Sequence, residues 1–137
     1  MKAINPYLTF DGQARDAMTF YAKNLGAKLE MQTFKEAGMA GPKDDPNRVI
    51  HAKLSVGSMV IMASDSPPGM PVTHGDGNWV SVDCDDVPEI ERLFTVFSAG
   101  GKVIMPLQDQ FWGARFGMIK DKYDMRWMFN CYLPKKS

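Results

Sequence analysis

The spacing of hydrophobic residues changes twice within the first 34 residues. Apolar and polar side chains alternate at 4–10, which predicts a half-buried strand. Helical spacing follows at 11–26, where one face should be buried and Gly26 provides a C-terminal stop. The residues on that face are Ala14, Ala17, Met18, Tyr21 and Leu25. Alternation resumes at 27–34, which predicts a second strand.

The remainder of the first half contains only strand-type spacing. A loop rich in Gly, Pro and Asp at 35–47 precedes the segment 48–64, which contains two strands turned at 56–58 (Val-Gly-Ser). The first half is therefore predicted to have the order β-α-β-β-β.

The second half repeats this order after a linker rich in Gly and Pro. Its predicted elements are a strand at 79–84, a helix at 85–101, a strand at 102–108 and a hairpin at 111–133 turned near Lys122-Tyr123. Asp86 is the expected N-cap of the helix, with Glu89 three residues later. The face that this helix should bury carries Val87, Ile90, Phe94 and Phe97.

This internal repeat predicts an α+β fold built from two βαβββ modules. The chain of 137 residues is long enough for one domain, with module 1 at about 1–65, the linker at about 66–77 and module 2 at about 78–137. Two such modules are expected to form a curved mixed sheet around a cleft.

Composition and charge exclude several classes of partner. Sixteen basic and sixteen acidic residues are scattered along the chain, so there is no basic surface for nucleic acid. No apolar run approaches the length of a membrane span, and we expect a cytoplasmic protein with no membrane partner. Cys84 and Cys131 make no CxxC pattern and are expected to be buried as small hydrophobic residues.

The hairpin at 111–133 concentrates large rings beside an arginine, so it is either sheet core or the wall of a pocket. Strand alternation should place Arg115 on the opposite side from Trp112. Glycines at 113 and 117 leave room beside Arg115, which would suit recognition of a carboxylate or phosphate; an arginine on the outer face of the sheet is equally compatible. Many methionines on the predicted strands suit a core or a permissive pocket.

The two histidines lie far apart in the sequence, at His51 in a predicted strand and His74 in the linker. Two ligands from separate segments do not make a metal site. His51 is better suited to a polar role in the cleft, where it could donate, accept or shuttle a proton.

Three segments carry a family resemblance: residues 6–29 (PYLTFDGQARDAMTFYAKNLGAKL), 50–65 and 111–131 (FWGARFGMIKDKYDMRWMFNC). With them the chain resembles the vicinal oxygen chelate superfamily of glyoxalase I, bleomycin-resistance proteins and extradiol dioxygenases. It is most similar to the PhnB-like branch, labelled as 3-demethylubiquinone 3-methyltransferase-like. The resemblance implies paired βαβββ modules and a homodimer. It does not imply one reaction.

Catalytic members of this superfamily hold a divalent metal with His, Gln or Glu at four positions. The matching positions here are Pro6, flanked by Asn5 and Tyr7; Ile61 or Met62; Gly77 to Trp79; and Met128. None is a good ligand for such a metal, so we expect no metal and no cofactor. Asp124 also stands where the family commonly has glycine in the hairpin turn.

The sequence therefore predicts a metal-free protein that binds a small planar or amphipathic molecule, such as an antibiotic or a metabolite. The predicted ligand-binding residues are His51, Trp79, Phe111, Trp112, Arg115 and Trp127. The alternative is a glyoxalase-like lyase or isomerase, or a dioxygenase, with an unconventional metal site or an acid–base site. In that case His51 and Arg115 are the candidate catalytic residues.

Overall fold

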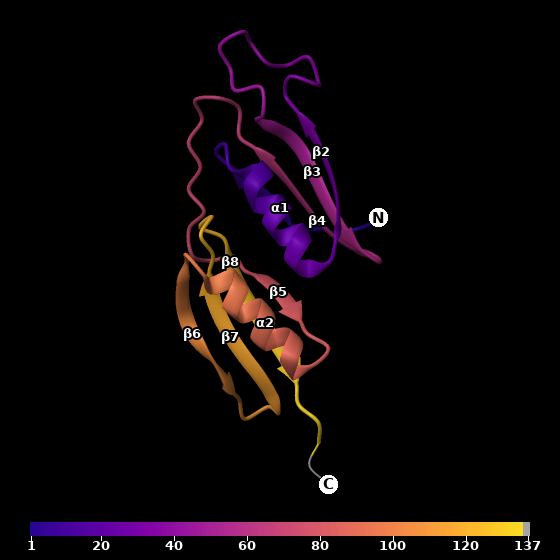
Figure 1. Cartoon of the computed structure of the whole chain (residues 1–137), viewed down its shortest axis with the longest axis vertical. Helices are drawn as coiled ribbons and strands as arrows, with labels where there is room; N and C mark the ends of the chain where they lie inside the picture. Colours follow the sequence, from indigo (N-terminus) through magenta and orange to yellow (C-terminus); the bar gives the residue numbers. More distant parts are fainter. Residues whose placement is uncertain (136–137) are drawn as a thin grey trace. The chain divides into compact units, whose positions relative to one another are not determined.

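A computed structural model describes residues 1–135 of the chain and divides it into two compact units. The first unit is Met1–Thr73, and the second begins at His74, inside the predicted linker. Each unit contains one helix and one four-stranded sheet in the order β-α-β-β-β (Figure 1). The predicted α+β fold of two βαβββ modules is confirmed, with the eight strands divided equally between two sheets.

The first unit matches the expected succession of elements. These are β1 (Tyr7–Phe10), α1 (Ala14–Leu25), β2 (Lys28–Thr33), β3 (Val49–Val56) and β4 (Met59–Asp65). The strand order in the sheet is β1-β4-β3-β2; β1 and β4 are parallel, and the other neighbours are antiparallel.

Helix α1 ends at the glycine that the sequence predicts as its C-terminal stop. Gly26 caps the C-terminus in the left-handed conformation with a φ of 66°, which glycine adopts without steric cost. The buried Asp65 carboxylate accepts hydrogen bonds from the backbone amides of Ala14 and Val49, so it connects β4 to α1 and β3. The buried face differs from the prediction at two positions, because Ala22 is buried and Leu25 is only half-buried.

The second unit has the same layout. Its elements are β5 (Val80–Asp83), α2 (Val87–Ser98), β6 (Lys102–Asp109), β7 (Ala114–Lys120) and β8 (Arg126–Tyr132). The strand order is β5-β8-β7-β6, with β5 and β8 parallel. No helix in the described residues is long and apolar enough to cross a membrane.

Helix α2 starts at the predicted cap. The Asp86 carboxylate accepts a hydrogen bond of 2.9 Å from the backbone amide of Glu89, and the Glu89 carboxylate accepts one from the amide of Asp85. The buried residues of this helix are Ile90, Leu93 and Phe97. Val87 and Phe94, which were expected to be buried, are half-buried.

The core of the second unit is an aromatic cluster beneath α2. The Phe97 ring meets Trp127 edge to face at 4.9 Å and Phe129 at 5.4 Å between ring centroids. Trp127 is fully buried, and its indole Nε1 donates a hydrogen bond of 2.8 Å to the Asp121 carboxylate. This cluster fixes which face of the sheet the helix covers.

The turn between β7 and β8 is organised by two aspartates. Asp121 accepts hydrogen bonds from the backbone amides of Tyr123 and Met125. Asp124 has a φ of 69°, and within residues 1–135 no other residue except glycine has a positive φ. Aspartate is among the few residues that tolerate this region, which explains how it replaces the glycine common in the family.

The start of the second unit is attached to this turn. The His74 Nδ1 atom lies 3.3 Å from the Asp124 carboxylate. Arg126 donates a hydrogen bond to the carbonyl of Gly75, and its guanidinium lies over the Trp79 ring at 5.3 Å. The segment that leads into β5 is therefore attached to the second unit by a histidine–carboxylate contact, a hydrogen bond and a cation–π contact.

Candidate functional site

The face of the second sheet opposite α2 carries the strongest candidate site, and strand register defines it. Residues that pair directly across neighbouring strands point to the same side of a sheet. Gly117 pairs with Phe129 on the side that α2 covers (Figure 1). Phe116 pairs with Asn130 on the opposite side, which we call the open face.

Side chains on the open face form three rows that cross the sheet from β6 to β5. The ring row contains Gln108, Phe116, Asn130 and Asp83; the methionine row contains Met105, Met118, Met128 and Ser81; the basic row contains Lys102, Lys120 and Arg126. Trp79, stacked on Arg126, continues the basic row. Successive rows are two residues apart along a strand, which is about 7 Å.

The open face is accessible along most of these rows. Gln108, Ser81 and Asp83 are exposed, while Phe116 and the methionines of β7 and β8 are half-buried. Asn130 is buried, and its side-chain amide donates a hydrogen bond of 3.3 Å to the Asp83 carboxylate. An apolar strip is therefore bordered by a carboxylate–amide pair on one side and by cationic side chains on the other.

Two exposed rings lie beside the ring row, in the turn before β7. Phe111 is 97% exposed and Trp112 is 45% exposed. Their rings meet edge to face at 5.2 Å, and Trp112 meets Phe116 at 5.7 Å. These contacts bring two predicted ligand-binding residues, Phe111 and Trp112, to the same end of the open face as Phe116. Large exposed rings in contact with one another are typical of binding surfaces.

Trp127 and Arg115 lie on the other face of the same sheet. Trp127 has no exposed surface in this structure and forms the core beneath α2, so it does not lie with the other predicted ligand-binding rings on the open face. Arg115 pairs with Cys131 and lies on the side of α2. The predicted room beside Arg115 is filled on the Gly117 side, because the Phe94 ring of α2 packs against Gly117, whereas nothing lies within 4 Å of a Cβ at Gly113.

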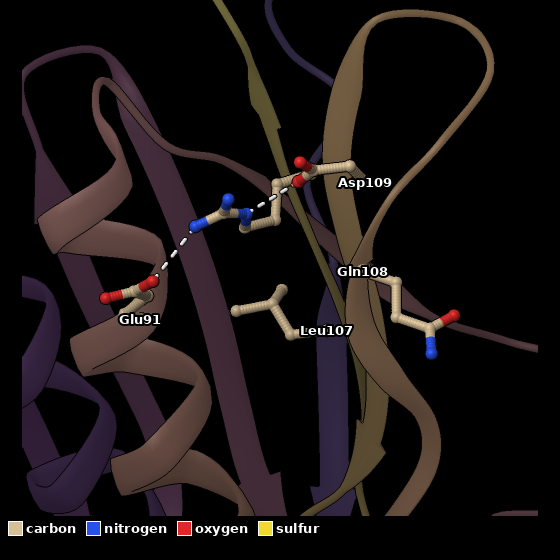
Figure 2. Close-up of a pocket in the computed structure, with 5 residues that line it drawn as sticks. Glu91, Leu107, Gln108 and Asp109 are labelled. Atoms are coloured by element: carbon tan, nitrogen blue, oxygen red, sulfur yellow. Dashed lines mark hydrogen bonds and ion pairs between the residues drawn. The ribbon is translucent and has the colours of Figure 1, made fainter.

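The Arg115 guanidinium is held between two carboxylates of its own unit (Figure 2). Its Nε donates to Asp109 at 2.7 Å, and its Nη1 donates to Glu91 at 2.9 Å. The hydrogen bond to Asp109 holds the pKa of Arg115 above its usual range, so this group stays cationic. An anionic ligand would have to compete with these two carboxylates for the guanidinium, and proton transfer by Arg115 is disfavoured.

A pocket of about 290 Å³ lies at this arginine, between α2 and strands β6 and β7. It is lined by Glu91, Leu107, Gln108, Asp109 and Arg115. Figure 2 shows the Gln108 side chain directed away from Glu91 and Leu107, consistent with its place in the ring row of the open face. Two carboxylates and one guanidinium leave the pocket with a formal charge of minus one, which does not suit the carboxylate or phosphate suggested by the sequence.

His51 lies in the first unit, exposed on the face of the sheet opposite α1. Its Nδ1 atom is 3.1 Å from the Tyr7 hydroxyl, and the two rings are 5.9 Å apart. The pair can exchange a hydrogen bond and could position the imidazole for proton transfer. His51 and Arg115, the candidate catalytic pair, therefore belong to different units.

The positions at which the superfamily holds its metal offer no suitable donor set here. Tyr7 pairs with Met62 in the first sheet, and Met128 lies on the open face of the second. Proline, thioether and indole side chains do not supply the imidazole or carboxylate that divalent metals require. Within residues 1–135 no group of three His, Cys, Asp or Glu residues could hold a metal ion.

Both cysteines are buried, as predicted. Burial raises the pKa of the Cys84 thiol to about 12, with nearby carboxylates such as Glu89 adding to the effect. Burial also raises the pKa of Cys131. Neither thiol is therefore activated as a nucleophile.

Comparison with known proteins decides the family. The sequence pattern of the family described as 3-demethylubiquinone-9 3-methyltransferase matches residues 2–129. The chain belongs to this family. It is also 32% identical to the protein YjdN of Escherichia coli K12, over 93% of each chain.

Solved structures agree with this assignment. The protein PA1353 from Pseudomonas aeruginosa is 40% identical over 96% of this chain and 98% of its own, with a TM-score of 0.85. A putative 3-demethylubiquinone-9 3-methyltransferase, the PhnB protein from Bacillus cereus, is 26% identical over 93% and 98% of the two chains, with a TM-score of 0.77. These matches support the PhnB-like assignment.

The fold extends to more distant proteins. A glyoxalase/bleomycin resistance protein/dioxygenase family enzyme from Burkholderia phytofirmans is 18% identical over 96% of this chain and all of its own, with a TM-score of 0.62. The 3-demethylubiquinone-9 3-methyltransferase family thus has the fold of the glyoxalase and bleomycin-resistance superfamily, as the sequence resemblance implied.

Proposed function

We propose that this protein binds a small planar or amphipathic molecule, an antibiotic or a metabolite, on the open face of the second sheet and without a metal. The observation that carries the proposal is the methionine row, which is bordered by Phe116 and the exposed Trp112 on the face without a helix. Thioether side chains adapt to ligand shape, and aromatic rings supply rigid contact area.

The donor chemistry supports the metal-free part of this proposal. Met128 stands at a superfamily metal position and is itself a member of the methionine row. The same position thus offers an apolar contact in place of a carboxylate ligand. We propose that this chain uses the open face to bind a ligand, as an apolar surface, and does not hold a metal there.

A thermal-shift screen of a small-molecule library tests the proposal, since a compound that binds only the folded state raises its melting temperature. Binding of the compounds found should weaken at least about threefold in Met118→Ala and in Trp112→Ala, because each removes part of the contact surface. Met59→Ala is the matched control: this methionine is 66% exposed on β4 of the first unit.

Two outcomes would contradict the proposal. Equal affinity in Met118→Ala, Trp112→Ala and wild type would place the ligand elsewhere. A stoichiometric transition metal that remains after dialysis of the purified protein would overturn the metal-free assignment.

A metal-free acid–base enzyme is the second candidate, and the Tyr7–His51 hydrogen bond favours it. If compounds from the screen are turned over, His51→Gln should abolish turnover while largely preserving binding, because it retains hydrogen bonding but not proton transfer near neutral pH. Loss of binding without a loss of turnover per bound ligand would exclude this role for His51.

A further inference from the structure

Asp83 is a carboxylate placed at the border of an apolar surface. It is exposed at the end of β5, and within residues 1–135 it forms no ion pair. Its hydrogen-bond partner is the side-chain amide of the buried Asn130. The sequence predicts Asp86 as the N-cap of the following helix, and Asp86 has that role. Asp83 has no part in that cap.

Asn130 on the neighbouring strand β8 fixes the position of the Asp83 carboxylate. The Asn130 backbone carbonyl accepts a hydrogen bond of 2.7 Å from the amide of Cys84, the residue after Asp83. The Asn130 side chain then reaches the Asp83 carboxylate from the neighbouring strand. One carboxylate oxygen is thereby held while the group as a whole remains open to solvent and to a ligand.

The charges on the open face are separated into two ends. Asp83 lies in the ring row, whereas the cationic side chains of Lys102, Lys120 and Arg126 lie two rows away, about 13 Å along the strands. The methionine row lies between them. Lys120 is ion-paired with Asp124 at 3.3 Å, so the positive charge at this end comes from Lys102 and Arg126. A ligand with a cationic end is attracted to Asp83 and repelled by these two side chains, which gives it one favoured orientation.

We propose that the ligand of this face carries a protonated amine or a similar cationic donor that binds Asp83, with a flat apolar body lying on Phe116 and the methionine row. This inference rests on the proposed function and adds the charge and orientation of the ligand. Asn130 acts as a positioning residue, because it orients the carboxylate and need not touch the ligand.

Three indole probes of similar size test the charge preference. Tryptamine is cationic at pH 7, 3-methylindole is neutral, and indole-3-acetate is anionic. Wild-type protein should bind tryptamine about fivefold more tightly than 3-methylindole, as expected for a partly exposed ion pair. Asp83→Asn should not weaken the binding of indole-3-acetate, whose carboxylate is attracted to the basic row instead. The advantage of tryptamine should shrink at high salt, which screens exposed charges.

Asp83→Asn should abolish this preference while leaving the affinity for 3-methylindole unchanged. Asp76→Asn is the matched control, because it removes the same charge from an exposed position in the same unit. It should keep the preference. Asn130→Ala should reduce the preference for tryptamine without reversing it, and its urea midpoint reports any loss of fold stability separately.

The outcomes separate this inference from the proposed function. If 3-methylindole and tryptamine bind equally, and binding is weakened by Trp112→Ala but not by Asp83→Asn, the amine site is wrong and the binding face stands. If an equal loss of tryptamine affinity occurs in Asp83→Asn and Asp76→Asn, only net charge matters and the inference fails. If none of the three probes binds, both the proposed function of the open face and the inference of an amine site at Asp83 are contradicted.

Discussion

Gly117 in β7 lies directly under the ring of Phe94 in α2, so that a Cβ atom at position 117 would be 2.5 Å from the Phe94 Cε2 atom. The same Cβ would be 3.2 Å from the Leu107 Cα atom of β6. The absence of a side chain at Gly117 therefore allows α2 to approach the sheet at the place where the sequence suggested room for a ligand.

We expect Gly117→Ala to lower the free energy of unfolding by about 1–3 kcal/mol, because overpacking forces the ring or the helix to move. The urea midpoint measures this change. Gly77→Ala is the control, since nothing lies within 4 Å of a Cβ at that position. An unchanged midpoint in Gly117→Ala would show that Phe94 rotates away at no cost.

Trp127→Ala should destabilise the fold by about 3–5 kcal/mol, because it removes a fully buried ring and leaves Asp121 without one of its donors. Trp112→Ala should change stability by less than about 0.5 kcal/mol, since Trp112 is 45% exposed. Urea titrations of the two variants measure these changes in the free energy of unfolding. Similar losses in both variants would contradict the assignment of these tryptophans to opposite faces.

The contribution of Asp124 to stability should depend on pH. Partial burial alone would raise the pKa of Asp124, but hydrogen bonds from His74 and Lys120 outweigh it and lower the pKa below its usual value of 3.8. The stabilisation is therefore present above about pH 4 and is lost as pH falls through the folded-state pKa. Because the group is exposed, we expect no more than about 0.5 kcal/mol.

Urea midpoints of wild type and Asp124→Asn from pH 6 to pH 3 measure this effect. The variant should be slightly less stable at pH 6, and the difference should shrink as the pH falls below 3.8 and through the folded-state pKa. Asparagine tolerates the positive φ of this turn, so the comparison isolates the charge. If the difference in urea midpoint between wild type and Asp124→Asn stays constant over this pH range, ionisation of Asp124 does not contribute to stability.

The Cys84 thiol should resist alkylation in the folded protein. With a pKa of about 12 it is almost entirely protonated at pH 8, and the thiolate is the reactive form. Iodoacetamide labelling followed by mass spectrometry should be at least about a hundredfold slower in native protein than in urea. Rapid native labelling at Cys84 would show that β5 opens readily or that the thiol is activated.

We expect a homodimer, as the family resemblance implies. Strand β6 is an edge of the second sheet and exposes Val103, Ile104 and Met105 in succession. Exposed apolar edges favour association with another chain. Sedimentation at micromolar concentration should give a species of twice the 15.3 kDa chain mass. A purely monomeric species would contradict this prediction.

The succession of elements could be predicted from sequence because local signals agree with the fold. Gly26 and Asp86 mark helix ends with groups that have definite capping roles, and both are found in those roles. The hairpin was also located correctly, since β7 and β8 pair in register from Ala114 opposite Tyr132 to Lys120 opposite Arg126.

The side of the sheet that each residue faces was harder to predict. Alternation separates Arg115 from Trp112 but does not say which side α2 covers. A signal was nevertheless present in β8, where Trp127 and Phe129 alternate with Arg126, Met128 and Asn130. Trp127, Phe129 and Cys131 are all apolar, so their side of β8 is the one that a helix should cover. Arg115 pairs with Cys131 in the hairpin and therefore lies on the same side.

The Asp83–Asn130 pair could not be found from sequence because the two residues are 47 positions apart and meet through a parallel strand pair. Such pairing depends on the crossover connection and leaves no local signature. The rows of the open face arise in the same way from register between distant strands.

The methionine row also determines how the protein would respond to oxidants. Met105 is 40% exposed, and its neighbours Met118 and Met128 share the same solvent-facing surface of three adjacent strands. Conversion of a thioether to a sulfoxide replaces a flexible apolar group with a polar, chiral one. Oxidation of these thioethers would thus change the chemistry of the open face, while the aromatic core beneath α2 would not be affected directly.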